Sequence, residues 1–296
     1  MPNADMMNKI EKGAGFIAAL DQSGGSTPKA LAGYGIGADA FSNDDEMFAL
    51  IHQMRSRIIT APSFGNGKVI GAILFEKTMN GDVDGKPVPT LLWERGVVPF
   101  LKVDKGLADE ENGVQLMKPI PDLDEQCKNA VSKGMFGTKM RSVINKANAE
   151  GIAAIVAQQF LFGKQILANG LVPMIEPEVN IKSDERADCD QILLGELTKH
   201  LDALADDQRV MLKLSIPVVP NLYKSLIDHP KVVRLVALSG GYSTDDACEE
   251  LAKNSGMIAS FSRGLLQDLR HEMTDEEFDA TLGGAIDQIH AASTAD

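Results

Sequence analysis

Charged side chains recur near the ends of the short apolar segments of this sequence. Asp21 follows one apolar run, Lys139 and Arg141 lie in another, and Lys213 stands inside Val-Met-Leu-Lys-Leu-Ser. Taking an ion out of water costs free energy unless the ion is paired. Charges of both signs that converge on one place satisfy each other and a polar ligand, so these residues predict a site.

Lys213 is the most informative of these residues, because its sequence neighbours on both sides are apolar. Desolvation and nearby cations both disfavour the ammonium form of a lysine. A lysine amine made partly neutral in this way attacks a carbonyl carbon and forms a Schiff base. The alternative is a structural lysine that only pairs with Glu176 or Glu178.

Further charged residues are spaced two apart, and such residues share one face of a strand. These pairs are Lys102 with Asp104, Lys139 with Arg141, and Glu176 with Glu178. The five histidines show no HxH or HExxH spacing, so a zinc-activated mechanism lacks ligands. We therefore expect carboxylates and lysines to perform the acid–base chemistry, with no metal and no cofactor.

A glycine turn, Ser239-Gly240-Gly241, precedes a segment that begins with helix-capping residues. Backbone N–H groups in such a turn can hold a phosphate. Two glycines alone usually mark only a turn, but Arg263 follows the next apolar run. The sequence therefore predicts a phosphate site formed by these residues, and a mobile loop at the other glycine pair, after Asp21.

These residues need elements that bring them together, and the chain alternates short apolar runs with longer amphipathic ones. Alternation of strand and helix predicts a parallel sheet, and eight units in about 250 residues favour a closed (β/α)₈ barrel, whose active site lies at the carboxyl ends of the strands. The open dinucleotide-binding sheet is disfavoured because GxGxxG is absent after the first run. The predicted strands are Gly15–Leu20, Val69–Leu74, Val97–Val103, Phe136–Ser142, Leu171–Val179, Val210–Ile216, Val232–Leu238 and Met257–Phe261.

Three of the predicted helices carry clear signals: one after a cap at Ser42–Asp45, one over Asp184–Leu204, and one after the Thr274/Glu277 capping box. Residues 27–41 and the Asn80–Pro89 loop look loosely built. No linker divides the chain, so we expect one barrel domain over residues 1–296, with a short N-terminal extension (1–13) and a C-terminal helix and tail (274–296).

The 296 residues carry 42 acids and 29 lysines and arginines, a net charge of −13. This balance argues against nucleic-acid and membrane partners. The predicted mouth is locally positive, with Lys102, Lys139, Arg141, Lys213 and Arg263 against Asp21, Glu176 and Glu178, so an anionic metabolite is still expected. Three scattered cysteines predict buried or half-buried thiols in a reducing compartment. No signal peptide is evident, and no apolar stretch approaches the ~18 residues of a membrane helix, so we expect a cytoplasmic protein.

In this order, the motifs resemble those of class I fructose-bisphosphate aldolases, particularly the shorter bacterial members. The resemblance runs from about residue 14 to 265 and rests on Leu-Asp21-Gln-Ser, Lys102-Val-Asp-Lys-Gly, Lys139-Met-Arg141, Glu176-Pro-Glu178, Leu-Lys213, Leu-Ser239-Gly-Gly and Ser260-Phe-Ser-Arg263. It implies a metal-independent lyase that converts fructose 1,6-bisphosphate to dihydroxyacetone phosphate and glyceraldehyde 3-phosphate. It leaves the oligomeric state open.

The resemblance also implies roles for individual residues. Lys213 forms the imine with C2 of the open-chain sugar, Glu176 shuttles protons, and Asp21 deprotonates the C4 hydroxyl. Lys139 and Glu178 lie near the reacting atoms, and Lys102 holds sugar hydroxyls. The implied phosphate ligands are Arg141 at the distant end, and Ser239, Gly240, Gly241, Ser260 and Arg263 at C1.

Two departures from the family pattern stand out. Animal members end in a tyrosine that protonates the enamine, whereas this sequence ends Ser-Thr-Ala-Asp, and Ser262 stands where relatives commonly have glycine. Two other readings keep the barrel: a Schiff-base aldolase for a sugar monophosphate, and a sugar-phosphate-binding barrel without turnover.

Overall fold

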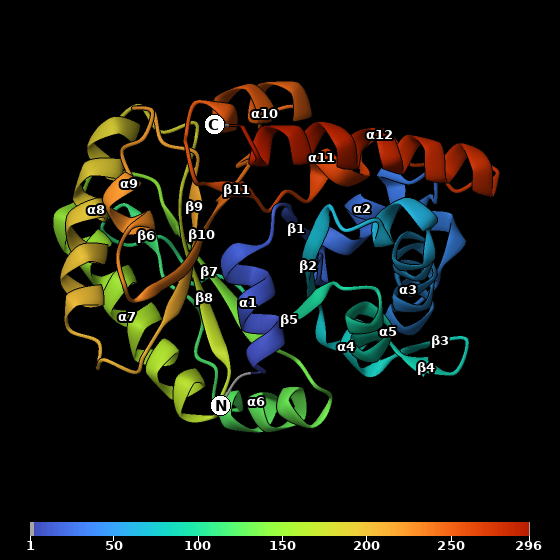
Figure 1. The fold of residues 1–296 in the computed structure, drawn as a ribbon, viewed down its shortest axis with the longest axis horizontal. Helices are drawn as coiled ribbons and strands as arrows, with labels where there is room; N and C mark the ends of the chain where they lie inside the picture. Colours follow the sequence, from blue (N-terminus) through green and yellow to red (C-terminus); the bar gives the residue numbers. More distant parts are fainter. Residues whose placement is uncertain (1–2, 296) are drawn as a thin grey trace.

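A computed structural model describes residues 3–295 and shows a near-closed TIM barrel (Figure 1). Eight parallel strands follow one another around the sheet in the order β1-β2-β5-β7-β8-β9-β10-β11. All eight predicted strands are confirmed, although the last is shorter than expected. Their bounds are β1 Phe16–Leu20, β2 Val69–Leu74, β5 Val98–Lys102, β7 Gly137–Ile144, β8 Val172–Val179, β9 Val210–Ser215, β10 Val232–Leu238 and β11 Ile258–Ala259.

The helices surround the strands as right-handed crossovers require. The predicted Thr274/Glu277 capping box opens the last helix, and the cap near Ser42 is Asn43, whose side chain accepts from the Glu46 N–H. Residues 27–41, expected to be loosely built, contain a helix. The helices after β1 are α2 Thr27–Gly33, α3 Asp44–Thr60, α4 Glu76–Asn80, α5 Val88–Glu94, α6 Leu123–Ser132, α7 Ala149–Ala168, α8 Arg186–Asp202, α9 Lys224–Ile227, α10 Thr244–Ala252, α11 Arg263–Leu266 and α12 Asp275–Ser293.

Three short strands lie outside the barrel path. The Asn80–Pro89 loop forms a hairpin of β3 (Asp82–Val83) and β4 (Lys86–Pro87). The third, β6 (Val114–Gln115), pairs antiparallel with the end of β7.

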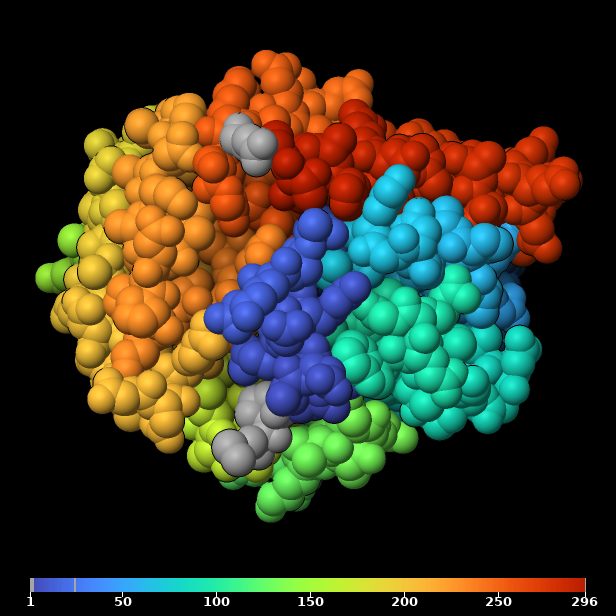
Figure 2. Space-filling view, in the orientation of Figure 1, coloured from blue at the N-terminus to red at the C-terminus, as the bar shows by residue number. Residues whose placement is uncertain are grey.

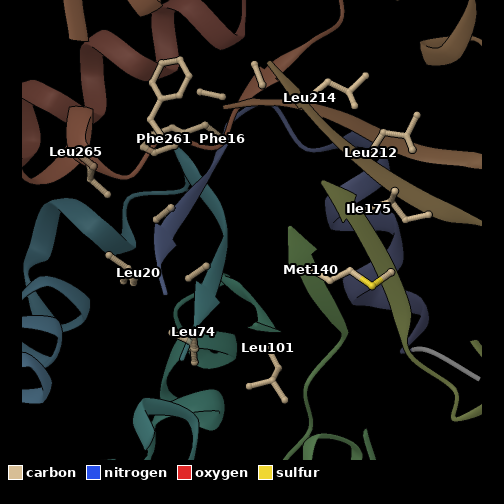
Figure 3. Close-up of a cluster of buried hydrophobic side chains, with 14 of the residues drawn as sticks. Phe16, Leu20, Leu74, Leu101, Met140, Ile175, Leu212, Leu214, Phe261 and Leu265 are labelled. Atoms are coloured by element: carbon tan, nitrogen blue, oxygen red, sulfur yellow. The ribbon is translucent and has the colours of Figure 1, made fainter. Parts of the chain in front are cut away.

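Alternate residues of each strand face two different apolar layers. One layer fills the space between strands and helices and includes Leu20, Met140, Ile175 and Leu212, which Figure 3 shows among the labelled side chains. The other layer fills the barrel interior. Because both faces of the strands are covered, the strands read as nearly continuous apolar runs.

The residues expected to form an N-terminal extension instead form part of the barrel core. Helix α1 (Ala4–Lys12) packs Met6 and Ile10 against the interior layer. In Figure 2 its residues occupy the centre of the visible face. Arg234 on β10 donates to the carbonyl oxygens of Glu11 and Gly13 at 2.8 and 3.4 Å, and so fixes the C-terminal end of α1. Residues 1, 2 and 296 of the expected extension and tail lie outside the described residues.

Helix α7 is, by length and composition alone, apolar enough to cross a membrane, and it is the one such helix in residues 3–295. The expectation that no apolar stretch approaches this length was therefore wrong. The helix packs against β8, β7 and α8, and a core helix of a barrel passes the same test.

Candidate active site

The inward-facing residues change from apolar to charged along several strands. Ala19, Phe100, Met174 and Met211 belong to the interior apolar layer. Two residues further on, at the same face of each strand, stand Asp21, Lys102, Glu176 and Lys213. The apolar layer thus forms a floor, and the charged layer lies above it at the carboxyl ends of the strands.

A buried chain of ion pairs joins four of these charged residues. Lys139 Nζ lies 2.8 Å from both Asp21 Oδ2 and Glu176 Oε2, and the other oxygen of Glu176 lies 3.2 Å from Lys213 Nζ. Lys213 and Glu176 are each 3% exposed, and Lys139 is 4% exposed. The structural pairing of Lys213 with Glu176 is therefore present, in a geometry that also suits proton transfer between the two groups.

Two members of these ion pairs, Asp21 and Lys139, hold each other ionised. Burial alone would raise the pKa of Asp21, but the charges of Lys139 and Lys213 outweigh it and hold that pKa well below the usual range. Burial alone would lower the pKa of Lys139, but the charges of Asp21 and Glu176 raise it well above the usual range. Asp21 is thus a carboxylate and Lys139 an ammonium ion across the neutral pH range.

Two further ion pairs lie beside this chain. Arg141 Nε donates to Glu178 Oε2, and both residues are only half-buried. Lys102 Nζ lies 2.9 Å from Asp104 Oδ1 and donates to the Asp104 carbonyl oxygen at 2.8 Å. Arg141 therefore remains accessible to an anion, whereas Lys102 is bound by its own loop.

The glycine turn and Arg263 meet as the sequence predicts. Gly240 and Gly241 both have positive φ, of 60° and 117°, and a Cβ on Gly241 would lie 3.2 Å from Arg263 Nη2. The hydroxyl of buried Ser260 has no hydrogen-bond partner in the described structure. A buried polar group without a partner is costly, so this hydroxyl is a candidate ligand contact.

One cavity of about 670 Å³ joins these features. It brings together every predicted site residue except Lys102. It is lined by five cations, Lys29, Lys139, Arg141, Lys213 and Arg263, and three acids, Asp21, Glu176 and Glu178, and by Ser239, Gly240, Gly241 and Ser260. The local excess of cations predicted from the sequence is present, although Lys29 lines the cavity and Lys102 does not.

Sequence reasoning missed several polar residues at this cavity. Lys29 reaches it from α2, within the stretch expected to be loosely built, and Ser26 reaches it from the preceding glycine turn, which was expected to be mobile. Gln22 also lines it, and the buried Arg55 donates to the Gln22 carbonyl oxygen at 2.5 Å. The positions of Ser26 and Lys29 near a glycine turn could have indicated that these two residues line the site. A single arginine in a helix, such as Arg55, gives no such indication.

Comparison with known proteins gives the family. The profile described as fructose-bisphosphate aldolase class-I matches residues 3–222, well over half of the chain. The chain belongs to the class I fructose-bisphosphate aldolase family. The matched span contains Asp21, Lys139, Glu176 and Lys213, whereas the glycine turn and Arg263 lie beyond it. Membership of this family implies a small-molecule substrate.

Solved structures support the barrel of this class I aldolase. It is similar to fructose-bisphosphate aldolase from Plasmodium falciparum, solved with TRAP and a small-molecule inhibitor, with a TM-score of 0.75 and 19% identity over 99% of this chain and 96% of that one. It is also similar to the Corynebacterium glutamicum protein Cgl0159, with a TM-score of 0.50 and 13% identity over 98% and 92% of the two chains. At these identities the likeness shows the fold alone.

Proposed function

We propose that this aldolase cleaves fructose 1,6-bisphosphate reversibly to dihydroxyacetone phosphate and glyceraldehyde 3-phosphate through a Schiff base on Lys213. The observation that carries the proposal is the placement of Lys213 Nζ, 3.2 Å from the Glu176 carboxylate in a buried charged layer that lines the cavity. A buried amine next to a carboxylate has both the nucleophile and the proton shuttle that imine formation needs.

The proposed steps use the residues of the ion-pair chain. The Lys213 amine adds to the C2 carbonyl of the open-chain sugar, and Glu176 protonates the hydroxyl that leaves as water. Asp21 removes the proton from the C4 hydroxyl, the C3–C4 bond breaks, and its electron pair moves through the imine to give an enamine. Glyceraldehyde 3-phosphate departs. Protonation of the enamine at C3 and hydrolysis of the imine then release dihydroxyacetone phosphate and restore Lys213.

The two ends of the cavity favour a bisphosphate over a monophosphate. Ser239, Gly240, Gly241, Ser260 and Arg263 are proposed to bind the C1 phosphate, and Arg141 the C6 phosphate. Bidentate Arg–phosphate contacts are among the stronger charge-assisted hydrogen bonds. Within residues 3–295, no three His, Cys, Asp or Glu side chains are placed to share a metal ion.

Borohydride trapping tests the proposal. Reduction in the presence of fructose 1,6-bisphosphate should fix a covalent adduct on the peptide that contains Lys213, detected by mass spectrometry, and inactivate the enzyme. Lys213→Met should lose both the adduct and the cleavage activity, whereas Lys199→Met, at an exposed lysine of α8, should keep both. Cleavage that survives Lys213→Met, or that EDTA abolishes, would contradict the proposal.

A further inference from the structure

A buried glutamine on α7 contacts the backbone of the central carboxylate residue. Gln159 is 0% exposed, and its Oε1 accepts a hydrogen bond from the Glu176 N–H at 2.8 Å. Its Nε2 donates to Ser142 Oγ on β7 at 2.9 Å. Both ends of one side-chain amide are therefore used to tie α7 to two neighbouring strands of the barrel.

The Gln159–Glu176 hydrogen bond lies where the regular pairing of β8 with β9 ends. In the described structure, the paired residues of β8 and β9 are Met174 with Met211 and Ile175 with Leu212. Glu176 comes directly after the last of these pairs. Further along, the Ser215 hydroxyl of β9 donates to the Val179 carbonyl oxygen of β8 at 2.6 Å. Gln159 thus holds the β8 backbone at the residue where regular pairing with β9 stops.

We propose that Gln159 is a positioning residue that sets the place of the Glu176 carboxylate between Lys139 and Lys213. The inference rests on the proposed function for its catalytic consequence. The two oxygens of Glu176 contact two different lysines, at 2.8 and 3.2 Å. Both contacts therefore depend on the position of the Glu176 backbone. A misplacement of about 1 Å can cost about 100-fold in rate.

The chain offers a matched control in the next residue. Gln158 also makes two amide hydrogen bonds, accepting from the Met117 N–H at 2.9 Å and donating to the Met117 carbonyl oxygen at 3.0 Å. Neither Gln158 nor Met117 lines the cavity. Gln158→Met therefore removes an equivalent pair of bonds from the same helix without touching Glu176.

The test compares Gln159→Met with Gln158→Met. Methionine keeps the length of glutamine but lacks its amide. We expect Gln159→Met to lower kcat for fructose 1,6-bisphosphate cleavage about 10- to 100-fold, with KM changed less than about threefold, because the residues that contact the phosphates are untouched. Gln158→Met should leave both constants within about threefold of the wild-type values. Equal losses of kcat in the two variants, or a loss that appears mainly in KM, would overturn the proposal.

A second measurement requires no sugar phosphate and separates this proposal from the proposed function. Reductive methylation with formaldehyde and cyanoborohydride reports the reactivity of the Lys213 amine, read by peptide mass. Displacement of the Glu176 charge disfavours the ammonium form, so Gln159→Met should accelerate methylation of Lys213 at least about threefold relative to Gln158→Met. An unchanged rate would overturn the positioning role, even if the wild-type protein cleaves another substrate.

Gln159→Glu covers the case in which Gln159→Met does not fold. Its side chain keeps an acceptor for the Glu176 N–H, and the Ser142 hydroxyl can donate to it. If Gln159→Met folds, we expect Gln159→Glu to have the higher kcat of the two variants. If Gln159→Met is insoluble, we expect Gln159→Glu to fold and to have a kcat within about tenfold of the wild-type value. Loss of all activity in a folded Gln159→Glu protein would contradict the proposal.

Discussion

The side-chain amide of Gln22 donates to the Ser262 hydroxyl at 2.5 Å, across the seam where the first and last strands of the barrel meet. The backbone contributes one hydrogen bond next to this contact, from the Ala19 N–H to the Phe261 carbonyl oxygen at 3.2 Å. Arg55 extends the link, because it donates to Gln22 Oε1 and to Thr78 Oγ1. A polar chain therefore closes the barrel directly beside Asp21.

Ser262→Gly tests this seam. Glycine removes the acceptor for Gln22, and the loss of one hydrogen bond should lower the free energy of unfolding by about 0.5–1.5 kcal/mol. Because Gln22 follows Asp21, kcat should fall a few-fold as well. Ser255→Gly, at an exposed turn residue, is the control in urea unfolding and in the cleavage assay. Identical behaviour of the two variants would show that the contact does not close the seam.

The buried ion pairs predict two pH limits for stability. The depressed pKa of Asp21 means that its contribution is complete above the ordinary aspartate value of 3.8 and is lost as the pH falls towards the folded-state pKa. The raised pKa of Lys139 means that its contribution is complete below 10.5 and is lost as the pH rises. Unfolding free energies measured from pH 2.5 to 11 should show both declines. The acid decline should be shallower in Asp21→Asn, and an equally steep decline would contradict the assignment.

Arg141→Ala should distinguish between the two ends of the substrate. Losing a charge-assisted contact to phosphate costs about 1.5–3 kcal/mol, so kcat/KM for fructose 1,6-bisphosphate should fall about 10- to 100-fold. The fall for fructose 1-phosphate should be much smaller. The same assay in Glu178→Gln controls for the loss of the Arg141–Glu178 pair. Equal losses on both sugars would remove Arg141 from the second phosphate site.

Gly241→Ala tests the glycine turn. The positive φ of 117° strains an alanine by about 1–3 kcal/mol, and its Cβ would press on Arg263. We expect a several-fold rise in KM at nearly unchanged kcat. Gly85→Ala is the matched control, since Gly85 has a φ of 77° and open space around the position of a Cβ. It should lose stability but keep KM, and a rise in KM common to both variants would implicate general strain instead.

The three thiols should be unreactive in the folded protein. Cys127, Cys189 and Cys248 are free and buried. Burial, assisted by nearby acids, raises the pKa of Cys127 to about 12 and that of Cys248 to about 11. The thiolate is the reactive form, so Ellman's reagent should react slowly in buffer and titrate three thiols after unfolding in guanidinium. A fast native phase would point to an opened region near one of them.

The barrel was largely predictable because its strands are covered on both faces. Runs such as Val69–Leu74 are apolar throughout and match β2 residue for residue. The last strand was predicted too long, because Met257 and Phe261 extend the apolar pattern but lie outside the ladder, which pairs only Ile258 and Ala259 with β10. Helix α2 was missed, since its short Thr-Pro-Lys-Ala-Leu-Ala-Gly sequence has no strong amphipathic period.

The candidate site was predictable where the alternation of side chains along a strand decides which residues face the barrel interior. Asp21, Lys139, Glu176 and Lys213 fall at inward positions on four strands, so the barrel brings them together. Lys102 has the same parity, but its own loop supplies Asp104 as a partner, a local bond that periodicity does not show. Arg55 and Gln159 act from helices across long sequence separations, and only the packed structure reveals them.

The N-terminal helix has a consequence for how the chain is made. Its C-terminal end is held by Arg234, whose partner Glu11 lies 223 residues earlier in the sequence. Such non-local contacts slow folding. A ribosome adds about 5–20 residues per second, so α1 emerges many seconds before the strand that anchors it. Met6 and Ile10 belong to an apolar layer whose members run from the first strand to Ile258 of the last, so this layer is complete only when nearly the whole chain has been made.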